Sequence, residues 1–348
     1  GFDLKFNKDV ISHSLFSLTH VKKSTRIMIE EKINNFLNAP NESINLGNIS
    51  NINLNENIGI FWGEEKIGQL NKGSSISSPI AEAINTEYLS SENKLLVSAK
   101  LQKWIDELIQ FKLSPLNETI DTTLSPNIRA IKFNLSESLG TLPVEKFKSF
   151  IKDISVEEKN AFSRLGVRIG AKYFFVPNFL KKASMELLAV LWCVFNNYRF
   201  DGFLPLPKDG RVSFVTENQM KKGYWFAIGY LRLNNFALRI DVFERIFFIA
   251  RQKLKLGPFL DSADLMNPVG CNREQLKDIL VYCGLTHLKL SNERILFFYE
   301  SKKVIPKPQR IKSKKIDLKS SSKNKKNINK NKKSADPNSP FAVLEKLL

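Results

Sequence analysis

The residue types that most often carry catalysis are few in this chain, and their spacing does not suit it. The three histidines, His13, His20 and His287, have no cysteine or carboxylate at metal-ligand spacing, so each is expected to be a surface or turn residue. Adjacent carboxylates on a helix point about 100° apart and rarely converge on one substrate. The adjacent pairs are Glu30-Glu31, Glu64-Glu65, Asp106-Glu107 and Glu157-Glu158. The sequence therefore predicts no catalytic centre and no metal site.

The chain also lacks a loop that would cradle nucleotide phosphates. The segment GEEKIGQLNKGSS (63–75) does not have the spacing of the P-loop, GxxxxGK[ST], and GVRIG (166–170) is too short for GxGxxG. No cofactor is therefore expected in this chain. Cys193, Cys271 and Cys283 are too few for a disulfide framework and too widely spaced for a zinc knuckle, which predicts three reduced core thiols.

Basic residues are the remaining side chains with a chemistry of their own. Of the net charge of +18, residues 302–333 hold +13, from fourteen Lys or Arg and one acid, and residues 334–348 hold −1, which leaves about +6 for residues 1–301. Lysines on a flexible tail bind phosphate backbones through counterion release, although such a tail can also serve solubility alone. The tail candidates for nucleic-acid binding are Lys312, Lys314, Lys315, Lys325, Lys326, Lys332 and Lys333.

The segment RLGVRIGAKYFFVPNFLKK (164–182) combines basic and aromatic residues, so it could form either a nucleic-acid surface or the entry of a helix into a core. Gly166 and Gly170 disfavour a continuous helix. We therefore expect a turn and a short strand, YFFV, that places Phe174, Phe175 and Phe179 in the core. Phosphate contact is left to Arg164, Arg168, Lys172, Lys181 and Lys182, of which the last two begin a helix, where a cation is unfavourable unless an anion is near.

The elements that position these residues form a predominantly helical α+β pattern. Apolar periodicity predicts a nearly all-apolar central helix at 183–197. Near the end of the globular part it predicts two helices followed by a hairpin, which is the order of a winged-helix-like unit. The first helix of such a unit would have to come from elsewhere in the chain. Asp241 and Arg245 are spaced to pair across one helical turn. The expected domains are a helical segment with an Asn-rich connector (1–56), a hairpin plus helix unit (57–125), a helical body (126–204), a winged-helix-like block (205–300), a disordered basic linker (301–335) and a short amphipathic docking motif (336–348).

The two ends of the chain carry expectations of their own. The docking motif has Phe341, Leu344 and Leu347 on an amphipathic turn that would meet a protein partner. The first residue is Gly1 and the first methionine is Met28, so we expect a fragment of a longer protein. No stretch reaches the roughly 18 uncharged apolar residues of a membrane span, which favours a cytoplasmic protein without membrane contact.

Residues 164–192, RLGVRIGAKYFFVPNFLKKASMELLAVLW, resemble a segment from the carboxy-terminal half of bacterial superfamily 2 helicases related to the mitochondrial degradosome RNA helicase. Ala183 stands where that family usually has a second proline. Six further segments are similar to the family in the same order. They are NIGIFWGEEKIGQL, KLQKWIDELI, IRAIKFNLSESLGTLP, GYWFAIGYLRLNNFALRIDVFERI, GCNREQLKDIL and DPNSPFAVLEKLL.

The resemblance implies an accessory carboxy-terminal region of an ATP-dependent RNA or DNA helicase. The motor domains, with the P-loop and DExH motifs, would precede Gly1 in cis and would use ATP and Mg²⁺, whereas this chain by itself should neither bind nor hydrolyse ATP. The region would guide the nucleic acid or dock partners. Two alternatives stay open from the residues: a stand-alone RNA-binding or ribosome-associated protein, and a non-enzymatic interaction scaffold.

Overall fold

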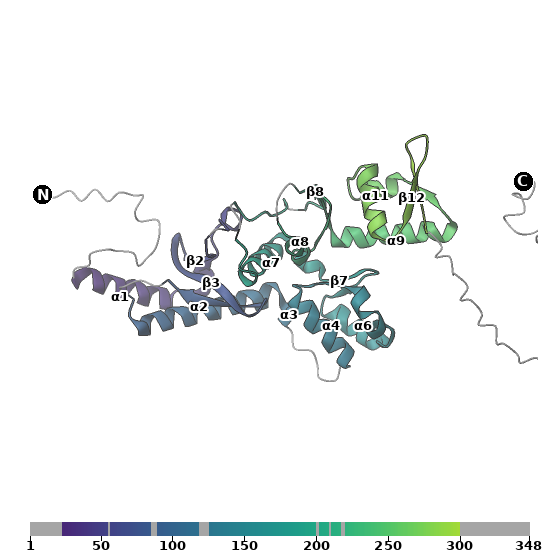
Figure 1. Ribbon diagram of the computed structural model, residues 1–348. Coiled ribbons are helices and arrows are strands. Elements are labelled where there is room, and N and C mark those ends of the chain that lie inside the picture. Colours follow the sequence, from purple (N-terminus) through teal and green to yellow (C-terminus); the bar gives the residue numbers. More distant parts are fainter. Residues whose placement is uncertain are drawn as a thin grey trace, which may run out of the picture. The chain divides into compact units, whose positions relative to one another are not determined.

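The computed structural model describes residues 23–54, 56–84, 89–117, 125–199, 202–208, 210–216 and 220–299. The chain divides into a unit spanning Gly1–Glu300 and a second spanning Ser301–Leu348, and every described residue belongs to the first. In the described part, helices alternate with small antiparallel sheets, so the fold is mixed α+β (Figure 1). None of the helices in these ranges is long and apolar enough to cross a membrane. The expected basic linker and docking motif lie outside the described residues.

The first part is a four-stranded sheet with order β1-β2-β3-β4 and two flanking helices. The two apolar runs of residues 58–70 predict a hairpin, which is present as β2 and β3. Pro79 and Ile80 are expected to lead into a polar loop, but they belong to a further strand, β4. β4 buries alternate residues, and its edge is satisfied by α2, because Ala81 N donates to Gln102 Oε1 at 2.9 Å and Ala83 N to Ser98 Oγ at 3.0 Å. The elements are α1 (Lys23–Asn38), η1 (Asn41–Ser43), β1 (Ile44–Asn45), η2 (Ile49–Asn51), β2 (Gly59–Trp62), β3 (Glu65–Ser75), β4 (Ser78–Ala83) and α2 (Ser91–Lys112).

The middle part surrounds α7, whose burial on nearly every side confirms the predicted central helix. Side-chain chemistry predicts helix caps at Ser155 and Asn272, and both are complete capping boxes, with Glu158 and Gln275 respectively. The predicted strand YFFV is β7, the middle strand of a sheet with order β5-β7-β6. The elements are α3 (Ser114–Asn117), α4 (Pro126–Glu137), β5 (Thr141–Pro143), η3 (Val144–Phe147), α5 (Lys148–Lys152), α6 (Val156–Arg164), β6 (Arg168–Ile169), β7 (Tyr173–Phe175), η4 (Pro177–Leu180) and α7 (Lys182–Phe195).

The last part contains two three-stranded sheets, β8-β10-β9 and β11-β13-β12. The apolar periodicity of residues 237–254 predicts one helix, but residues 237–239 belong to β10 and the helix, α9, begins at Ile240. The expected Asp241–Arg245 pair is wrong, because Asp241 accepts two hydrogen bonds from Arg239, at 2.7 and 3.0 Å. The elements are β8 (Ser213–Val215), α8 (Lys222–Ala227), β9 (Tyr230–Leu233), β10 (Phe236–Arg239), α9 (Ile240–Leu256), β11 (Phe259–Leu260), α10 (Ala263–Met266), α11 (Arg273–Tyr282), β12 (Thr286–Lys289) and β13 (Ile295–Phe298).

Strand β7 contributes side chains to two separate hydrophobic cores. Phe174 and Val176 belong to the larger core, which is built mainly by the first two parts, whereas Tyr173 and Phe175 belong to the core around α9 and α11. The alternation follows from the strand itself, because successive side chains point to opposite faces. The predicted burial of Phe174, Phe175 and Phe179 is confirmed, with exposed fractions of 0%, 6% and 3%.

Candidate nucleic-acid interface

A groove of about 530 Å³ lies beside the turn between β6 and β7, and we call it the basic-aromatic groove. Its lining combines cations with aromatic rings, a composition suited to phosphates and bases together. The lining comes from the η3–α5 segment, the β6–β7 turn, α9, the end of α11 and the residue after β13. These residues are Pro143, Glu145, Lys148, Ala171, Lys172, Tyr173, Phe247, Arg251, Tyr282 and Tyr299.

The β6–β7 turn is held by a carboxylate from α9. Glu244 accepts the backbone N–H groups of Ala171, Lys172 and Tyr173 at 2.7, 2.8 and 2.7 Å. A Cβ at Gly170 would lie 2.5 Å from the Glu244 carboxyl carbon, so the turn needs glycine there. Burial raises the pKa of Glu244 above its ordinary value, although the three backbone N–H groups oppose the shift. The turn therefore presents Lys172 from a backbone that is fixed on α9.

Lys172 and Arg251 share one aromatic ring at the floor of the groove. The Lys172 Nζ lies 5.2 Å from the centroid of the buried Phe247 ring, and the Arg251 guanidinium carbon lies 5.8 Å from it. The Lys172 carbonyl also accepts the Val144 N–H at 2.8 Å, so both backbone polar groups of Lys172 are bonded. Two cations over one ring leave a local excess of positive charge that an incoming phosphate can neutralise.

The third cation, Lys148, is partly neutralised within the groove. Its Nζ lies 2.6 Å from Glu145 Oε1, and this hydrogen bond lowers the pKa of Glu145. Both side chains are more than half exposed, and such surface pairs contribute little stability and exchange partners easily. With three cations and one acid, the groove keeps a charge of +2.

Two half-exposed tyrosines complete the lining. Tyr282 is 48% exposed and Tyr299 is 52% exposed. The Tyr282 ring stands edge-on to Phe243, with centroids 5.8 Å apart, and its hydroxyl is hydrogen-bonded to that of the buried Tyr173. Burial, followed by this hydrogen bond, raises the pKa of Tyr173 well above its usual range, so Tyr173 stays an uncharged phenol. The exposed faces of Tyr282 and Tyr299 are thus available for stacking.

The five basic residues of segment 164–182 that were predicted to contact phosphate do not lie at one site. Lys172 lines the groove, whereas Arg168 is exposed on β6 and lines a different hollow of about 400 Å³ with Ser163 and Asn178. The other three are exposed at helix ends: Arg164 at the end of α6, and Lys181 and Lys182 at the start of α7. The seven tail lysines and the docking residues Phe341, Leu344 and Leu347 lie outside the described residues.

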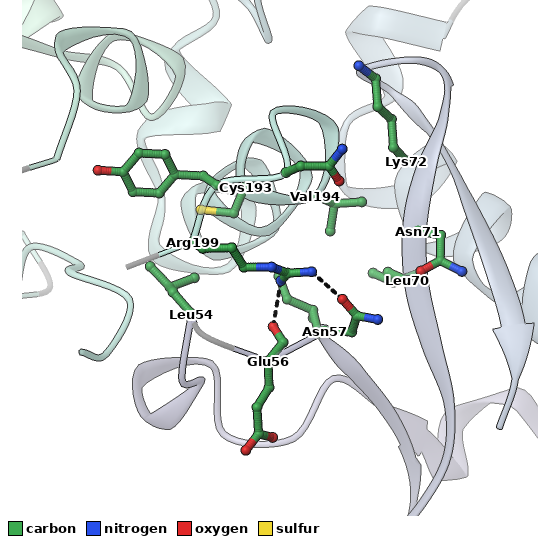
Figure 2. Close-up of a pocket in the computed structure, with 12 residues that line it drawn as sticks. Leu54, Glu56, Asn57, Leu70, Asn71, Lys72, Cys193, Val194 and Arg199 are labelled. Carbon is green, nitrogen blue, oxygen red and sulfur yellow. Dashed lines mark hydrogen bonds between the residues drawn. The ribbon is translucent and has the colours of Figure 1, made fainter. Parts of the chain in front are cut away.

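A small hollow near the end of α7 is structural. In Figure 2 the Arg199 guanidinium lies between Glu56 and Asn57, and it donates to the Glu56 backbone oxygen at 2.8 Å and to the Asn57 side chain. The hollow measures about 30 Å³, room for one or two waters. It is therefore too small for a nucleotide, and its hydrogen bonds tie the segment before β2 to the end of α7.

The remaining chemistry-bearing residues give no second centre. In the described ranges, no three His, Cys, Asp or Glu side chains are grouped to hold a metal ion. Burial raises the pKa of Cys193 and Cys283 to about 12 and that of the half-buried Cys271 to about 11, so these free cysteines stay protonated. No known family model, curated protein or solved structure matches the chain.

Most of the groove could not be identified from the sequence. Lys148, Arg251, Tyr282 and Tyr299 come from four segments that are far apart along the chain, so no local pattern joins them. The one local signal is Phe247 with Arg251, four residues apart on a helix, where aromatic and cationic side chains share a face. Of the residues that line the groove, the sequence predicts only Lys172 as a phosphate contact.

Proposed function

We propose that this chain is the accessory region of an ATP-dependent helicase and that its basic-aromatic groove binds single-stranded RNA or DNA. The composition of the groove carries the proposal: two cations over Phe247 and two half-exposed tyrosines in about 530 Å³. Proteins that bind single strands without sequence preference combine cations that contact the backbone with aromatic rings that stack on bases. A duplex hides its base faces, so the tyrosines would favour unpaired nucleotides.

The helicase context is supported by the ordered segments that resemble superfamily 2 helicases, and the groove contains part of the first of them, Ala171–Tyr173. The motor domains, which would act in cis, and their ATP and Mg²⁺ belong to this proposal. The chain would guide the strand after it leaves the motor.

The unit from α9 to β13 supports the same function as a winged-helix-like module. Its order is helix, strand, two helices and two strands, with β13 between β11 and β12. In this interpretation α9 is the first helix and α10 the second, so no helix from elsewhere is needed. On α11, Arg273 and Lys277 are balanced by Glu274 and Asp278, which does not suit a helix that reads duplex DNA. The groove, which uses α9 and the two tyrosines, is the better site.

The test is the affinity of the full chain for a fluorescent single strand and for a duplex of equal length, compared between wild type and Tyr299→Ala. Loss of one stacking contact costs about 1–3 kcal/mol, so Tyr299→Ala should weaken single-strand binding by about 5- to 150-fold. Duplex binding, which the lysine tail would dominate, should change less than about twofold.

Phe133→Ala removes an aromatic side chain that is 67% exposed on α4 and does not line the groove, and it serves as the matched control. Tyr299→Phe keeps the ring and should retain binding. Equal affinities of wild type and Tyr299→Ala for the single strand would refute the groove as the binding site. Wild-type affinity that is undetectable for both nucleic acids would favour an interaction scaffold.

A further inference from the structure

We infer that the outward face of α9, formed by Phe248, Arg251 and Lys255, carries the bound single strand beyond the groove. We call this surface the α9 track. The inference rests on the proposed function, and it adds a second contact surface for the same ligand with its own test.

Helical geometry places the α9 track in line with the groove. Glu244, Phe248, Arg251 and Lys255 are spaced i, i+4, i+7 and i+11, so they share one face of α9. Glu244 holds the β6–β7 turn, and Arg251 lines the groove. The face therefore meets the groove at Arg251, with Phe248 about one turn before that residue and Lys255 about one turn after it.

The exposure of Phe248 is unusual for its helix. Phe243 and Phe247 are buried, with exposed fractions of 0% and 6%, whereas Phe248 is 62% exposed. A lone exposed apolar residue needs no explanation by itself. Here, however, cations follow it three and seven residues later on the same face, which is the alternation of ring and charge that a stacked base and its phosphates require.

Charge identifies the occupant as an anionic strand. The last turn of α9 adds Lys253 and Lys255, and Lys253 is already bonded to Asp264, with Nζ and Oδ2 3.0 Å apart. Lys255 is exposed, and Arg251 reaches both the groove and the track. From Phe248 to Lys255 the helix rises about 10 Å, at about 1.5 Å per residue. That length corresponds to about three stacked nucleotides at about 3.4 Å each.

The test compares single strands of two lengths. Oligothymidylate of about four nucleotides fills the groove alone, whereas one of about twelve also covers the track. Phe248→Ala in the full chain should weaken binding of the longer strand about 5- to 20-fold and that of the shorter strand less than about twofold. Phe133→Ala, on α4, should change neither. Lys255→Gln should reduce the salt slope of log affinity by about 0.7 for the longer strand only.

The outcomes separate the two claims. Unchanged affinity of Phe248→Ala for the longer strand, or an equal loss at both lengths, overturns the track. The groove is judged independently, by whether Tyr299→Ala weakens the shorter strand. A loss with Tyr299→Ala but none with Phe248→Ala would leave the groove standing and remove the track.

Discussion

At the scale of single residues, the hydrogen bonds of Glu244 fix the position of the Lys172 backbone. A carboxylate is the side chain best suited to accept three convergent backbone N–H groups, and it does so here from a neighbouring helix. The sequence offers only adjacent carboxylate pairs as a pattern to weigh. The role of Glu244 cannot be predicted from it, because the partners of Glu244 lie more than seventy residues earlier. The placement of Lys172 is thus a tertiary property, although Lys172 itself belongs to the segment 164–182.

Asp261 has a comparable structural role beside β13. Its carboxylate is 2% exposed and accepts from the Ile295 N–H at 2.8 Å and from Arg273 Nε at 2.9 Å, with Arg294 Nε 3.5 Å away. Burial would raise the pKa of Asp261, but the Ile295 N–H and the two guanidinium groups outweigh it and hold the pKa below its usual value. The ionised form therefore stabilises the fold.

Asp261→Asn should lower the free energy of unfolding by about 2–3 kcal/mol at neutral pH, because charge-assisted hydrogen bonds are lost. Since the folded pKa is depressed, the contribution of Asp261 is present above the unfolded pKa of about 3.9 and is lost as pH falls through the folded value. Urea denaturation at about pH 7 and about pH 3 should show the difference between wild type and variant shrinking at the lower pH. Asp153→Asn, at an exposed residue after α5, is the control. A difference that is constant with pH would contradict this account.

At the scale of elements, the sequence predicts those helices and strands whose formation depends on side chains only a few residues apart. The Ser155 and Asn272 caps, the apolar α7 and the strand YFFV follow from side-chain chemistry within a few residues. β4 does not follow from local signals, because its own first residues are Ser78 and Pro79 and because α2, not a further strand, satisfies its edge. β10 was overlooked because Ala237 and Leu238 fit a helix as well as a strand, and only pairing with β8 and β9 decides between them.

Gly140 lies in close contact with Phe179 of η4, so a substitution there measures how tightly the two are packed. It has φ +87°, and a Cβ there would lie 2.4 Å from a carbon of the buried Phe179 ring. Gly140→Ala should therefore cost more than the roughly 1–2 kcal/mol of left-handed strain alone, because it must also displace the Phe179 ring of η4. Gly284→Ala, with φ +94° and nothing within 4 Å of the added Cβ, carries the strain without the clash. Equal losses of thermal stability in the two variants would show that Phe179 moves aside freely.

At the scale of the whole molecule, the groove depends on both cores. Lys148 and Lys172 come from elements that bound the larger core, whereas Phe247, Arg251 and Tyr282 come from those of the smaller one. β7, which belongs to both cores, brings them together. This is why charge and family resemblance predict nucleic-acid binding from the sequence, whereas the groove proposed for it depends on tertiary structure. The lysine-rich residues 302–333 would add affinity without distinguishing paired from unpaired strands.

The proposal that the groove binds unpaired nucleotides is tested most directly by photocrosslinking. A single strand that carries iodouracil is irradiated with the full chain, and the crosslinked peptides are identified by mass spectrometry. Because aromatic rings that stack on the base are the preferred acceptors, the account predicts adducts on Tyr282 or Tyr299, competed away by unlabelled single strand more readily than by duplex. Adducts confined to aromatic residues outside the groove, such as the exposed Phe133, would contradict it.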